Sequence, residues 1–275
     1  ISKKTNILNS HNRRILHLAA VISCNFSNFC YLMAHNILQE NNIDFNLLKP
    51  LISYTAEKNT EKEPYSNQTG PARRGDSNII KSHLSMLKNE KYKKIYKLLS
   101  ESIIKEYEKW IQKKLKQIKA IVLDVDGVLT NGGLIIYPDG KFLRQMNAKD
   151  GYAIKLAIKH GLVIGVITGG REQNIKSRLE HLGVKEVFLG AHNKLPILKQ
   201  FLKKHNINKE NVMYMGDDIP DLEVLKYVGF SCCPSDASYD IQKICDYISI
   251  KKGGEGCVRD VIEQTLKVTD KWDLD

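Results

Sequence analysis

Apolar residues follow two different rhythms along this chain. Up to about residue 116 they recur every three or four residues, the spacing of one face of an amphipathic helix. The stretches with this spacing are 15–40, 43–57, 78–89 and 91–115. From residue 119 onward, short apolar runs alternate with amphipathic stretches. The pattern therefore predicts an all-α first domain, residues 1–116, and an α/β second domain, residues 117–275.

Six apolar runs in the second half have the length and composition of buried strands. They read AIVLDV, LVIGVIT, EVFLG, VMYMGD, GFSCC and DYISI. Nearly continuous apolar strands separated by helices are typical of a parallel sheet covered on both faces, so we expect a doubly wound, Rossmann-like sheet. The stretch NGGLIIYPDGKFLRQMN interrupts this alternation after the first strand. Its two β-prone runs flank Pro138, Asp139 and Gly140, which together predict a β-hairpin turn.

The longest apolar stretch is ILHLAAVISCNFSNFCYLMAHNIL, residues 15–38. Polar side chains such as Asn25, Asn28 and His35 interrupt it, and it falls short of the uninterrupted run of about 18 residues expected of a bilayer span. We therefore expect a largely buried helix of a soluble, cytoplasmic protein with no membrane partner. The chain begins with Ile1 and shows no secretory signal pattern, so we expect its natural start to lie upstream.

Charge and cysteine content narrow the class of protein. The 275 residues carry a formal net charge of +11, which would suit an acidic partner. The basic residues are interspersed with acidic ones, however, and no zinc-ligand spacing or arginine-rich arm accompanies them, so we expect no nucleic-acid partner. The six cysteines form no C-x-x-C pair and are typical of buried thiols in a reducing compartment.

Acidic side chains follow the predicted strands at their carboxyl ends. Asp124 and Asp126 end the first strand, Thr168 follows the second, and Asp217 and Asp218 follow the run VMYM. In an open parallel sheet these ends meet in one crevice. Like charges brought together repel unless a cation lies between them, and an all-oxygen ligand set suits Mg²⁺. The sequence thus predicts a magnesium site.

Four short motifs resemble those of the haloacid dehalogenase superfamily of phosphotransferases. They are DVDGVLT, ITGG, the NK of GAHNKLPIL, and GDDIPDLEVL, in the family's order. The hairpin, the segment KDGYAIK and the late segment GGEGCVRDVIE resemble one branch closely, the capless 3-deoxy-D-manno-octulosonate 8-phosphate phosphatases. The resemblance runs from about 117 to 268. It implies a Mg²⁺-dependent hydrolysis of that sugar-acid phosphate to sugar acid and phosphate.

The resemblance also implies roles for individual residues. Asp124 is expected to attack phosphorus and form an aspartyl-phosphate, and Asp126 to act as general acid and base. The Asp124 carboxylate, the Asp126 backbone carbonyl and Asp217 are expected to hold Mg²⁺. Thr168 and Lys194 are expected to hold the phosphoryl oxygens, which makes them catalytic as well. Asp218 and a further acid, Asp221, would also fit helix capping, but we favour for both a supporting role behind the metal ligands.

The same branch implies a set of substrate-binding residues. They are Asp126, Asn147, Ala148, Lys149, Asp150, Gly151, Lys155, Arg178 and Lys194. Lys155 stands where many members carry Arg, and Gly170 stands where many carry Arg directly after "TG", so the preferred sugar acid is open. A related hydrolase of another sugar-acid phosphate or a nucleotide, and a non-catalytic scaffold, are the alternatives. Because the branch has no cap domain, the resemblance also implies a homo-oligomer, a tetramer, in which neighbouring subunits cover the active sites.

Residues 13–106 resemble a different family. RRILHLAAVISCNFSNFCYLMAHNIL and QTGPARRGD are similar to the helical C-terminal domain of Rossmann-like, 6-phosphogluconate-dehydrogenase-like proteins of unknown function. In that family a nucleotide-binding half comes first, but no G-x-G-x-x-G follows a strand in this sequence. We therefore expect no dehydrogenase activity from the helices. We expect a packing or oligomerisation domain left by an upstream truncation or a gene fusion.

Overall fold

The computed structural model describes residues 7–61, 64–138 and 142–272. The chain divides into two compact units, residues 1–104 and 105–275. The division falls inside the long helix α6 (Glu90–Leu115), so the last turns of this helix belong to the C-terminal unit. The expected domain boundary after residue 116 lies just past the end of α6 and stays a prediction.

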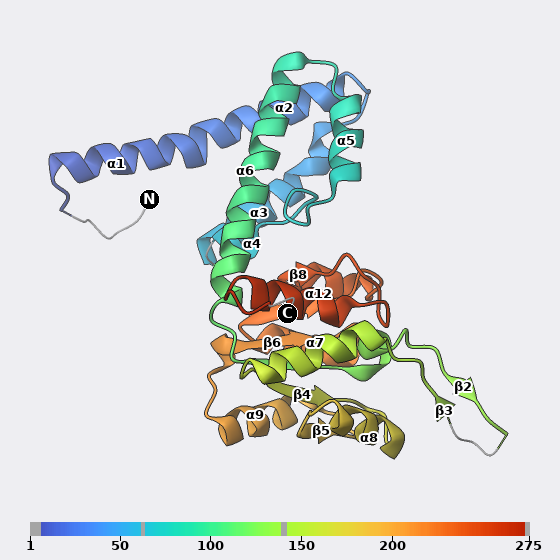
Figure 1. The fold of residues 1–275 in the computed structure, drawn as a ribbon. Coiled ribbons are helices and arrows are strands. Elements are labelled where there is room, and N and C mark those ends of the chain that lie inside the picture. Colours follow the sequence, from blue (N-terminus) through green and yellow to red (C-terminus); the bar gives the residue numbers. More distant parts are fainter. Residues whose placement is uncertain (1–6, 62–63, 139–141, 273–275) are drawn as a thin grey trace. The chain divides into compact units, whose positions relative to one another are not determined.

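The N-terminal unit consists of helices and connecting turns, with no strand among its described residues, as the apolar spacing predicts (Figure 1). Its elements are α1 (Ser10–Ala20), η1 (Val21–Phe26), α2 (Ser27–Gln39), η2 (Phe45–Leu48), α3 (Lys49–Glu61), α4 (Pro64–Asn67), α5 (Ser77–Met86) and most of α6. Side-chain hydrogen bonds join α6 to other helices of the unit. Asn36 donates to the Tyr92 hydroxyl at 2.8 Å, and the ring of His83 lies 2.8 Å from the Tyr96 hydroxyl.

The expectation of a largely buried helix over residues 15–38 is wrong. The continuous helical stretch Ser10–Gln39 has no buried residue, and large apolar side chains along it, such as Ile22 and Phe26, are more than half exposed. By length and composition alone, it is also the one helix among the described residues that is apolar enough to cross a membrane, a criterion that core helices and signal sequences meet as well. Helical spacing shows which residues share a face, but not whether another element covers that face.

The C-terminal unit contains a six-stranded parallel sheet with the order β5-β4-β1-β6-β7-β8. Its strands are β1 (Ala120–Leu123), β4 (Val163–Ile167), β5 (Glu186–Phe188), β6 (Val212–Met215), β7 (Phe230–Cys233) and β8 (Tyr247–Ile248). All six predicted strands are confirmed. The strand order reverses next to β1, which creates a crevice at the carboxyl ends of β1, β4 and β6.

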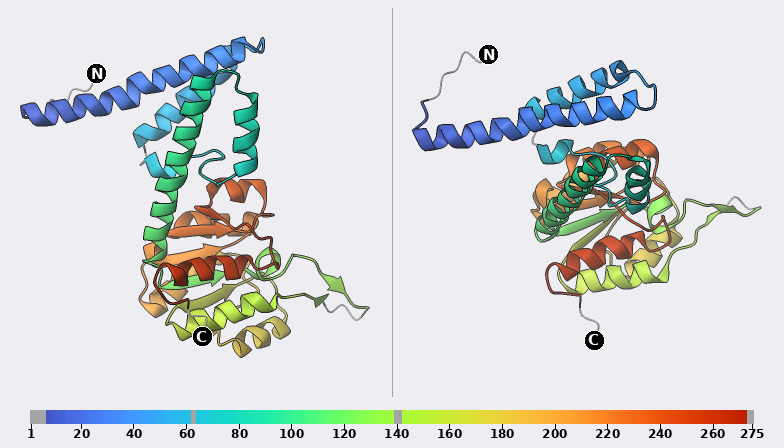
Figure 2. Two further views of the ribbon diagram at one scale, coloured as in Figure 1. Left: turned by 45° about the horizontal axis from the view of Figure 1, so that its top comes forward. Right: turned by 90° about the horizontal axis from the view of Figure 1, so that it is seen from above.

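Two layers of helices cover the sheet, and each packs against its own hydrophobic core. Ile121 and Leu123 of β1 face one layer, whereas Val122 faces the other, as the two-residue period of a strand requires. The first layer contains α7 (Ala148–Lys159), α8 (Gln173–His181) and α12 (Cys257–Lys267), and α7 and α12 lie side by side (Figures 1 and 2). The second contains α9 (Lys194–His205), α10 (Leu222–Tyr227) and α11 (Tyr239–Ile244).

A β-hairpin follows β1, as predicted. Its strands β2 (Ile135–Ile136) and β3 (Phe142–Leu143) pair antiparallel, and the hairpin projects away from the sheet (Figures 1 and 2). Of the predicted turn, Asp139 and Gly140 lie outside the described residues. Between β1 and α7 the described residues hold this hairpin and one π-turn, so the fold is a doubly wound sheet without a helical cap.

Candidate active site

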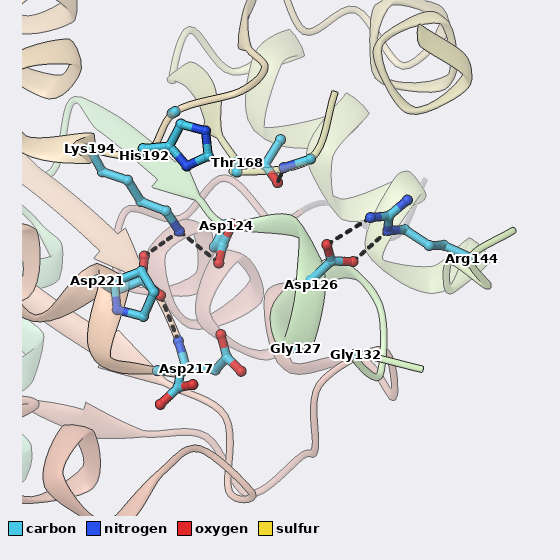
Figure 3. Close-up of a pocket in the computed structure, with 15 residues that line it drawn as sticks. Asp124, Asp126, Gly127, Gly132, Arg144, Thr168, His192, Lys194, Asp217 and Asp221 are labelled. Carbon is cyan, nitrogen blue, oxygen red and sulfur yellow. Dashed lines mark hydrogen bonds and ion pairs between the residues drawn. The ribbon is translucent and has the colours of Figure 1, made fainter. Parts of the chain in front are cut away.

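After β1 the chain makes a tight turn, and the two acidic side chains at this turn point in different directions. Residues Val125–Leu129 form a single π-turn in which Gly127 has φ +80°, a left-handed conformation that glycine adopts without strain. The carboxylate of Asp124 points toward Lys194, and the carboxylate of Asp126 points away from it (Figure 3). Two residues of the same sign are thereby separated although only Val125 lies between them.

The segment GGEGCVR, residues 253–259, lies far along the sequence from this turn but packs against it. A Cβ on Gly253 would lie 2.0 Å from the carbonyl oxygen of Gly127, so the close approach requires glycine. The Gly254 N–H donates to the Val128 carbonyl at 2.9 Å, and the Cys257 thiol donates to the same oxygen at 3.2 Å. The C-terminal segment therefore fixes the backbone that carries Asp124 and Asp126.

Lys194 joins two buried carboxylates. It is the first residue of α9, its side chain is 3% exposed, and its Nζ lies 2.8 Å from Asp124 Oδ2 and 2.7 Å from Asp221 Oδ1. The Tyr214 hydroxyl and the Asp217 backbone N–H also donate to the Asp221 carboxylate. Asp221 is thus a buried acceptor that holds the lysine in place, and its predicted role behind the metal ligands stays a prediction.

The buried charges change one another's affinity for protons. Burial and the charge of Asp221 raise the pKa of Asp124 to about 7, although Lys194 opposes this shift. Burial, with the charges of Asp221 and Asp218, raises the pKa of Asp217 to about 7. Burial by itself lowers the pKa of Lys194, but the two carboxylates outweigh it and the pKa is raised. One lysine does not compensate for the acids gathered here.

Asp124, Asp217 and Asp221 can each bring one oxygen to within 4.8 Å of the others. Asp217 follows β6, the strand next to β1, and Leu123 pairs with Met215, so parallel pairing places Asp217 one residue beyond the position opposite Asp124. A Cβ on Gly127 would lie 1.9 Å from Asp217 Oδ2, which shows how closely the two strand ends approach. The predicted metal ligands Asp124 and Asp217 are therefore brought together by the sheet itself.

These groups surround a cavity of about 470 Å³ at the carboxyl ends of the strands (Figure 3). Thr168 directly follows β4, is buried and lines this cavity, and its Oγ1 accepts a hydrogen bond from the Gly170 N–H at 3.1 Å. All the predicted catalytic and metal-binding residues contribute to this lining, which reads Asp124, Asp126, Gly127, Gly132, Arg144, Thr168, Gly169, Gly170, Ala191, His192, Lys194, Asp217, Asp218, Pro220 and Asp221.

The predicted substrate-binding residues on α7 lie outside this cavity. Asn147 caps α7, since its side chain accepts from the Lys149 N–H and donates to the Gly254 carbonyl. Asp150 is buried and accepts from the Arg259 backbone N–H, and burial raises its pKa to about 6. Gly151 is buried in α7, whereas Ala148, Lys149 and Lys155 are exposed on it.

Arg178 lines a second cavity of about 250 Å³, together with Arg144, Met146, Asn174 and Ile175. Of the predicted substrate-binding residues, only Asp126 and Lys194 line the catalytic cavity of a single chain.

Two lining residues with ionisable side chains have no counterpart in the sequence prediction. Arg144 follows the hairpin strand β3 and forms ion pairs with Asp126 and Glu172. A lone arginine after a short strand carries no sequence signal. His192 lies two residues before Lys194 in the segment GAHNK, so its closeness to a predicted catalytic residue could have indicated a place in the site. Its Nε2 lies 3.1 Å from the Arg171 guanidinium.

Comparison with known proteins assigns the C-terminal unit to a family. Residues 180–262 match the model of the haloacid dehalogenase-like hydrolases, and residues 1–103 match a domain of unknown function, DUF2520. The chain is 34% identical over 163 residues to the 3-deoxy-D-manno-octulosonate 8-phosphate phosphatase KdsC of Escherichia coli BL21-DE3. The matched region covers 59% of this chain and 87% of that protein. The chain belongs to the haloacid dehalogenase-like hydrolases of the KdsC kind. It is an enzyme, a phosphatase of phosphoric monoesters.

Solved structures agree with this placement of the KdsC-like unit. The phosphatase of Moraxella catarrhalis, solved with a magnesium ion, a phosphate ion and KDO, is 32% identical with a TM-score of 0.58, over 59% of this chain and 94% of that one. The Yersinia pestis phosphatase is 31% identical with a TM-score of 0.57, over 58% and 86%. Both matches cover about the length of the C-terminal unit. The N-terminal helical unit instead matches DUF2520.

Proposed function

We propose that this protein hydrolyses 3-deoxy-D-manno-octulosonate 8-phosphate to the free sugar acid and inorganic phosphate, with Mg²⁺ as cofactor. The observation that carries the proposal is the arrangement of Asp124, Asp217 and Lys194 around one cavity at the sheet's carboxyl edge. The similarity to phosphatases named for this substrate supports the choice of ester.

The side chains of the cavity suit a divalent cation. Five aspartates line it, against Lys194 and Arg144 as the full positive charges. A phosphate ester is itself an anion, so such a cavity would repel it. Burial and neighbouring acids raise the pKa values of Asp124 and Asp217, so a cation between them would stabilise their charged forms, and carboxylate oxygens are the ligands that Mg²⁺ prefers.

Asp124, Asp217 and the Asp126 backbone carbonyl would hold the ion. Bound Mg²⁺ would supply Lewis-acid neutralisation of charge on the phosphoryl group.

Each catalytic side chain has a task that its position suits. Asp124 is held on the cavity floor by hydrogen bonds from the Val125 N–H and from Lys194, which leaves it oriented to attack phosphorus and form an aspartyl-phosphate. Lys194 and Thr168 would hold the phosphoryl oxygens. Asp126, on the far side of the turn, would give a proton to the leaving sugar oxygen and later take one from water.

The sugar acid needs contacts that one chain does not place at the cavity. Asn147, Ala148, Lys149, Asp150, Gly151, Lys155 and Arg178 are the proposed substrate-binding residues. We propose a homo-tetramer in which a neighbouring subunit brings part of this set to the cavity. In the same proposal the enzyme works in the cytoplasm without nucleic-acid or membrane partners, residues 117–275 form the phosphatase domain, and residues 1–116 form a helical packing or oligomerisation domain.

A phosphate-release assay tests the proposal. The substrates are 3-deoxy-D-manno-octulosonate 8-phosphate, a nine-carbon sugar-acid phosphate, a hexose 6-phosphate and a nucleoside monophosphate, each with Mg²⁺ and with a chelator. We expect the highest kcat/KM for the first and no turnover without Mg²⁺. Asp124→Asn should abolish turnover, whereas Asp240→Asn, an exposed acid on α11, should not. A higher kcat/KM for another ester would overturn the substrate, and an active Asp124→Asn variant would overturn the chemistry.

A further inference from the structure

Arg144 is a buried cation that the catalytic roles above leave unexplained. It directly follows β3, so the hairpin delivers it to the sheet edge, and its side chain is 6% exposed. It belongs to the lining of the 470 Å³ catalytic cavity and to that of the adjoining 250 Å³ cavity. Arg144 therefore lines both cavities, and its guanidinium lies beside Asp126, the acid that would serve the leaving group.

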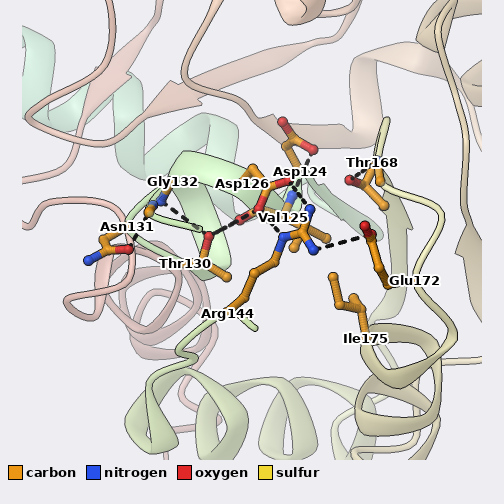
Figure 4. Close-up of polar contacts among 12 residues, drawn as sticks. Asp124, Val125, Asp126, Thr130, Asn131, Gly132, Arg144, Thr168, Glu172 and Ile175 are labelled. Atoms are coloured by element: carbon orange, nitrogen blue, oxygen red, sulfur yellow. Dashed lines mark hydrogen bonds and ion pairs between the residues drawn. The ribbon is translucent and has the colours of Figure 1, made fainter. Parts of the chain in front are cut away.

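The guanidinium grips both oxygens of Asp126 (Figure 4). Nε donates to Oδ1 at 2.6 Å and Nη2 donates to Oδ2 at 3.0 Å, the fork geometry of a bidentate pair. Thr130 Oγ1 also lies 3.4 Å from Oδ1. The Asp126 side chain is 35% exposed and sits on a turn, so it would have rotamer freedom without this grip.

Glu172 holds the arginine from behind. Its Oε2 lies 3.2 Å from Arg144 Nη1, a nitrogen with no other partner among the described residues. Gly170 leaves room for this pair, since a Cβ there would lie 3.0 Å from Glu172 Oε2 and 3.4 Å from Arg144 Nη2. The buried guanidinium thus has a second carboxylate that keeps it compensated when one of its bonds to Asp126 opens.

We propose that Arg144, held by Glu172, is the positioning residue that aims Asp126 at the leaving oxygen of the ester. The inference rests on the proposed phosphatase reaction and names a determinant of it. Both oxygens of Asp126 accept from Arg144 in this structure, so one bond must open when that oxygen carries the proton for the leaving group, and the other bond keeps the carboxyl group oriented. A lysine offers no planar fork and cannot hold one oxygen while releasing the other in the same plane.

Two esters with different leaving groups separate this role from a structural one. Expelling p-nitrophenolate needs little protonation, whereas expelling a sugar alkoxide needs a general acid, which is typically worth about 10²–10⁴-fold in rate. With Mg²⁺ present, we expect Arg144→Gln to slow aspartyl-phosphate formation from the sugar phosphate about 100-fold and from p-nitrophenyl phosphate less than about 5-fold. Both rates are measured in single turnover, because the later hydrolysis of the aspartyl-phosphate is common to the two esters. KM for the sugar phosphate should change little. Arg144→Lys should recover only a small part of the loss.

A double variant and a matched control complete the test. Adding Arg144→Gln to Asp126→Asn should slow sugar-phosphate turnover no further, because both act through the same carboxylate. Lys176→Gln removes the same charge from α8, where the lysine pairs with Glu180, and should leave both rates unchanged.

Equal losses for the two esters, additive losses in the double variant, or a rise in KM with unchanged kcat would overturn the positioning role while leaving the phosphatase intact. A wild-type enzyme inactive on every ester would overturn both.

Discussion

Replacing Lys194 by methionine is the sharpest test of the electrostatic balance in the cavity. Methionine keeps most of the side-chain length but removes the charge that lies 2.8 Å from Asp124 and 2.7 Å from Asp221. Both carboxylates are almost fully buried, so neither can gain compensation from water. Removing one partner of a buried ion pair typically costs about 3–5 kcal/mol, because the other charge stays buried and uncompensated.

This cost translates into a measurable melting temperature. In domains of 150–250 residues, 1 kcal/mol shifts Tm by roughly 2–4 °C, so the metal-free Lys194→Met variant should melt about 6–20 °C below wild type. The deficit should be larger at pH 8 than at pH 5.5, since burial already raises the pKa of Asp124 and loss of the lysine removes the main group that lowers it. Phosphate release should fall about 10²–10³-fold, the usual effect of losing one preorganised donor.

Differential scanning calorimetry with a chelator, alongside a phosphate-release assay with Mg²⁺, measures both effects. Lys203→Met is the matched control, because Lys203 lies on the same helix, is exposed and carries the same charge. It should melt within about 1 °C of wild type, as surface substitutions usually change stability by less than about 0.5 kcal/mol. A Lys194→Met variant as stable and as active as this control would refute the reasoning.

Three further outcomes follow from the structure. Gly127→Ala should weaken Mg²⁺ binding, measured by calorimetry, at least tenfold, because the new Cβ would displace the Asp217 carboxylate. Gly161→Ala is the control: Gly161 has a similar φ of +84° and no atom near its Cβ position, so this variant should bear the same backbone strain without losing Mg²⁺ affinity. Burial raises the pKa of Asp124 to about 7, so between roughly pH 4 and 7 the metal-free folded state binds more protons than the unfolded state, and this group's contribution to stability falls as pH rises. The Tm of Asp124→Asn minus the Tm of wild type should therefore increase with pH, and a constant difference would contradict the shift. Phe230→Ala should lower the free energy of unfolding by about 3–5 kcal/mol in urea, because a ring that is 1% exposed leaves a cavity, and a loss under 1 kcal/mol would show that the core collapses around it.

The sequence predicts the C-terminal unit in detail because its signals are local. A strand that is apolar along its whole length is buried on both faces whatever surrounds it, so AIVLDV and VMYMGD predict β1 and β6 without further information. Parallel pairing then brings the groups that follow these strands to one edge. Asp124 and Asp217 meet for this reason, and a reading of strand ends is enough to expect them there.

Spacing within a helix leaves burial undecided. The apolar positions of residues 15–38 correctly predict a helix, yet the stretch Ser10–Gln39 has no buried residue. Periodicity is a property of the segment, whereas burial depends on what packs against it, which only tertiary contacts supply. The same holds for Asn147, whose side chain caps α7 and donates to the Gly254 carbonyl, a bond across 107 positions of sequence.

The sequence by itself determined the order of strands and helices along the chain. It also determined that carboxylates follow β1 and β6 and that a lysine begins α9, because each of these features depends on residues within a few positions of one another. Only the tertiary structure decided that Arg144 reaches back from the hairpin to Asp126, 18 positions earlier, and that Glu172 holds it there. A single arginine has many acidic neighbours within reach of a flexible chain. Folding selects one of them by fixing the backbone of the turn, the hairpin and the β4 loop relative to one another.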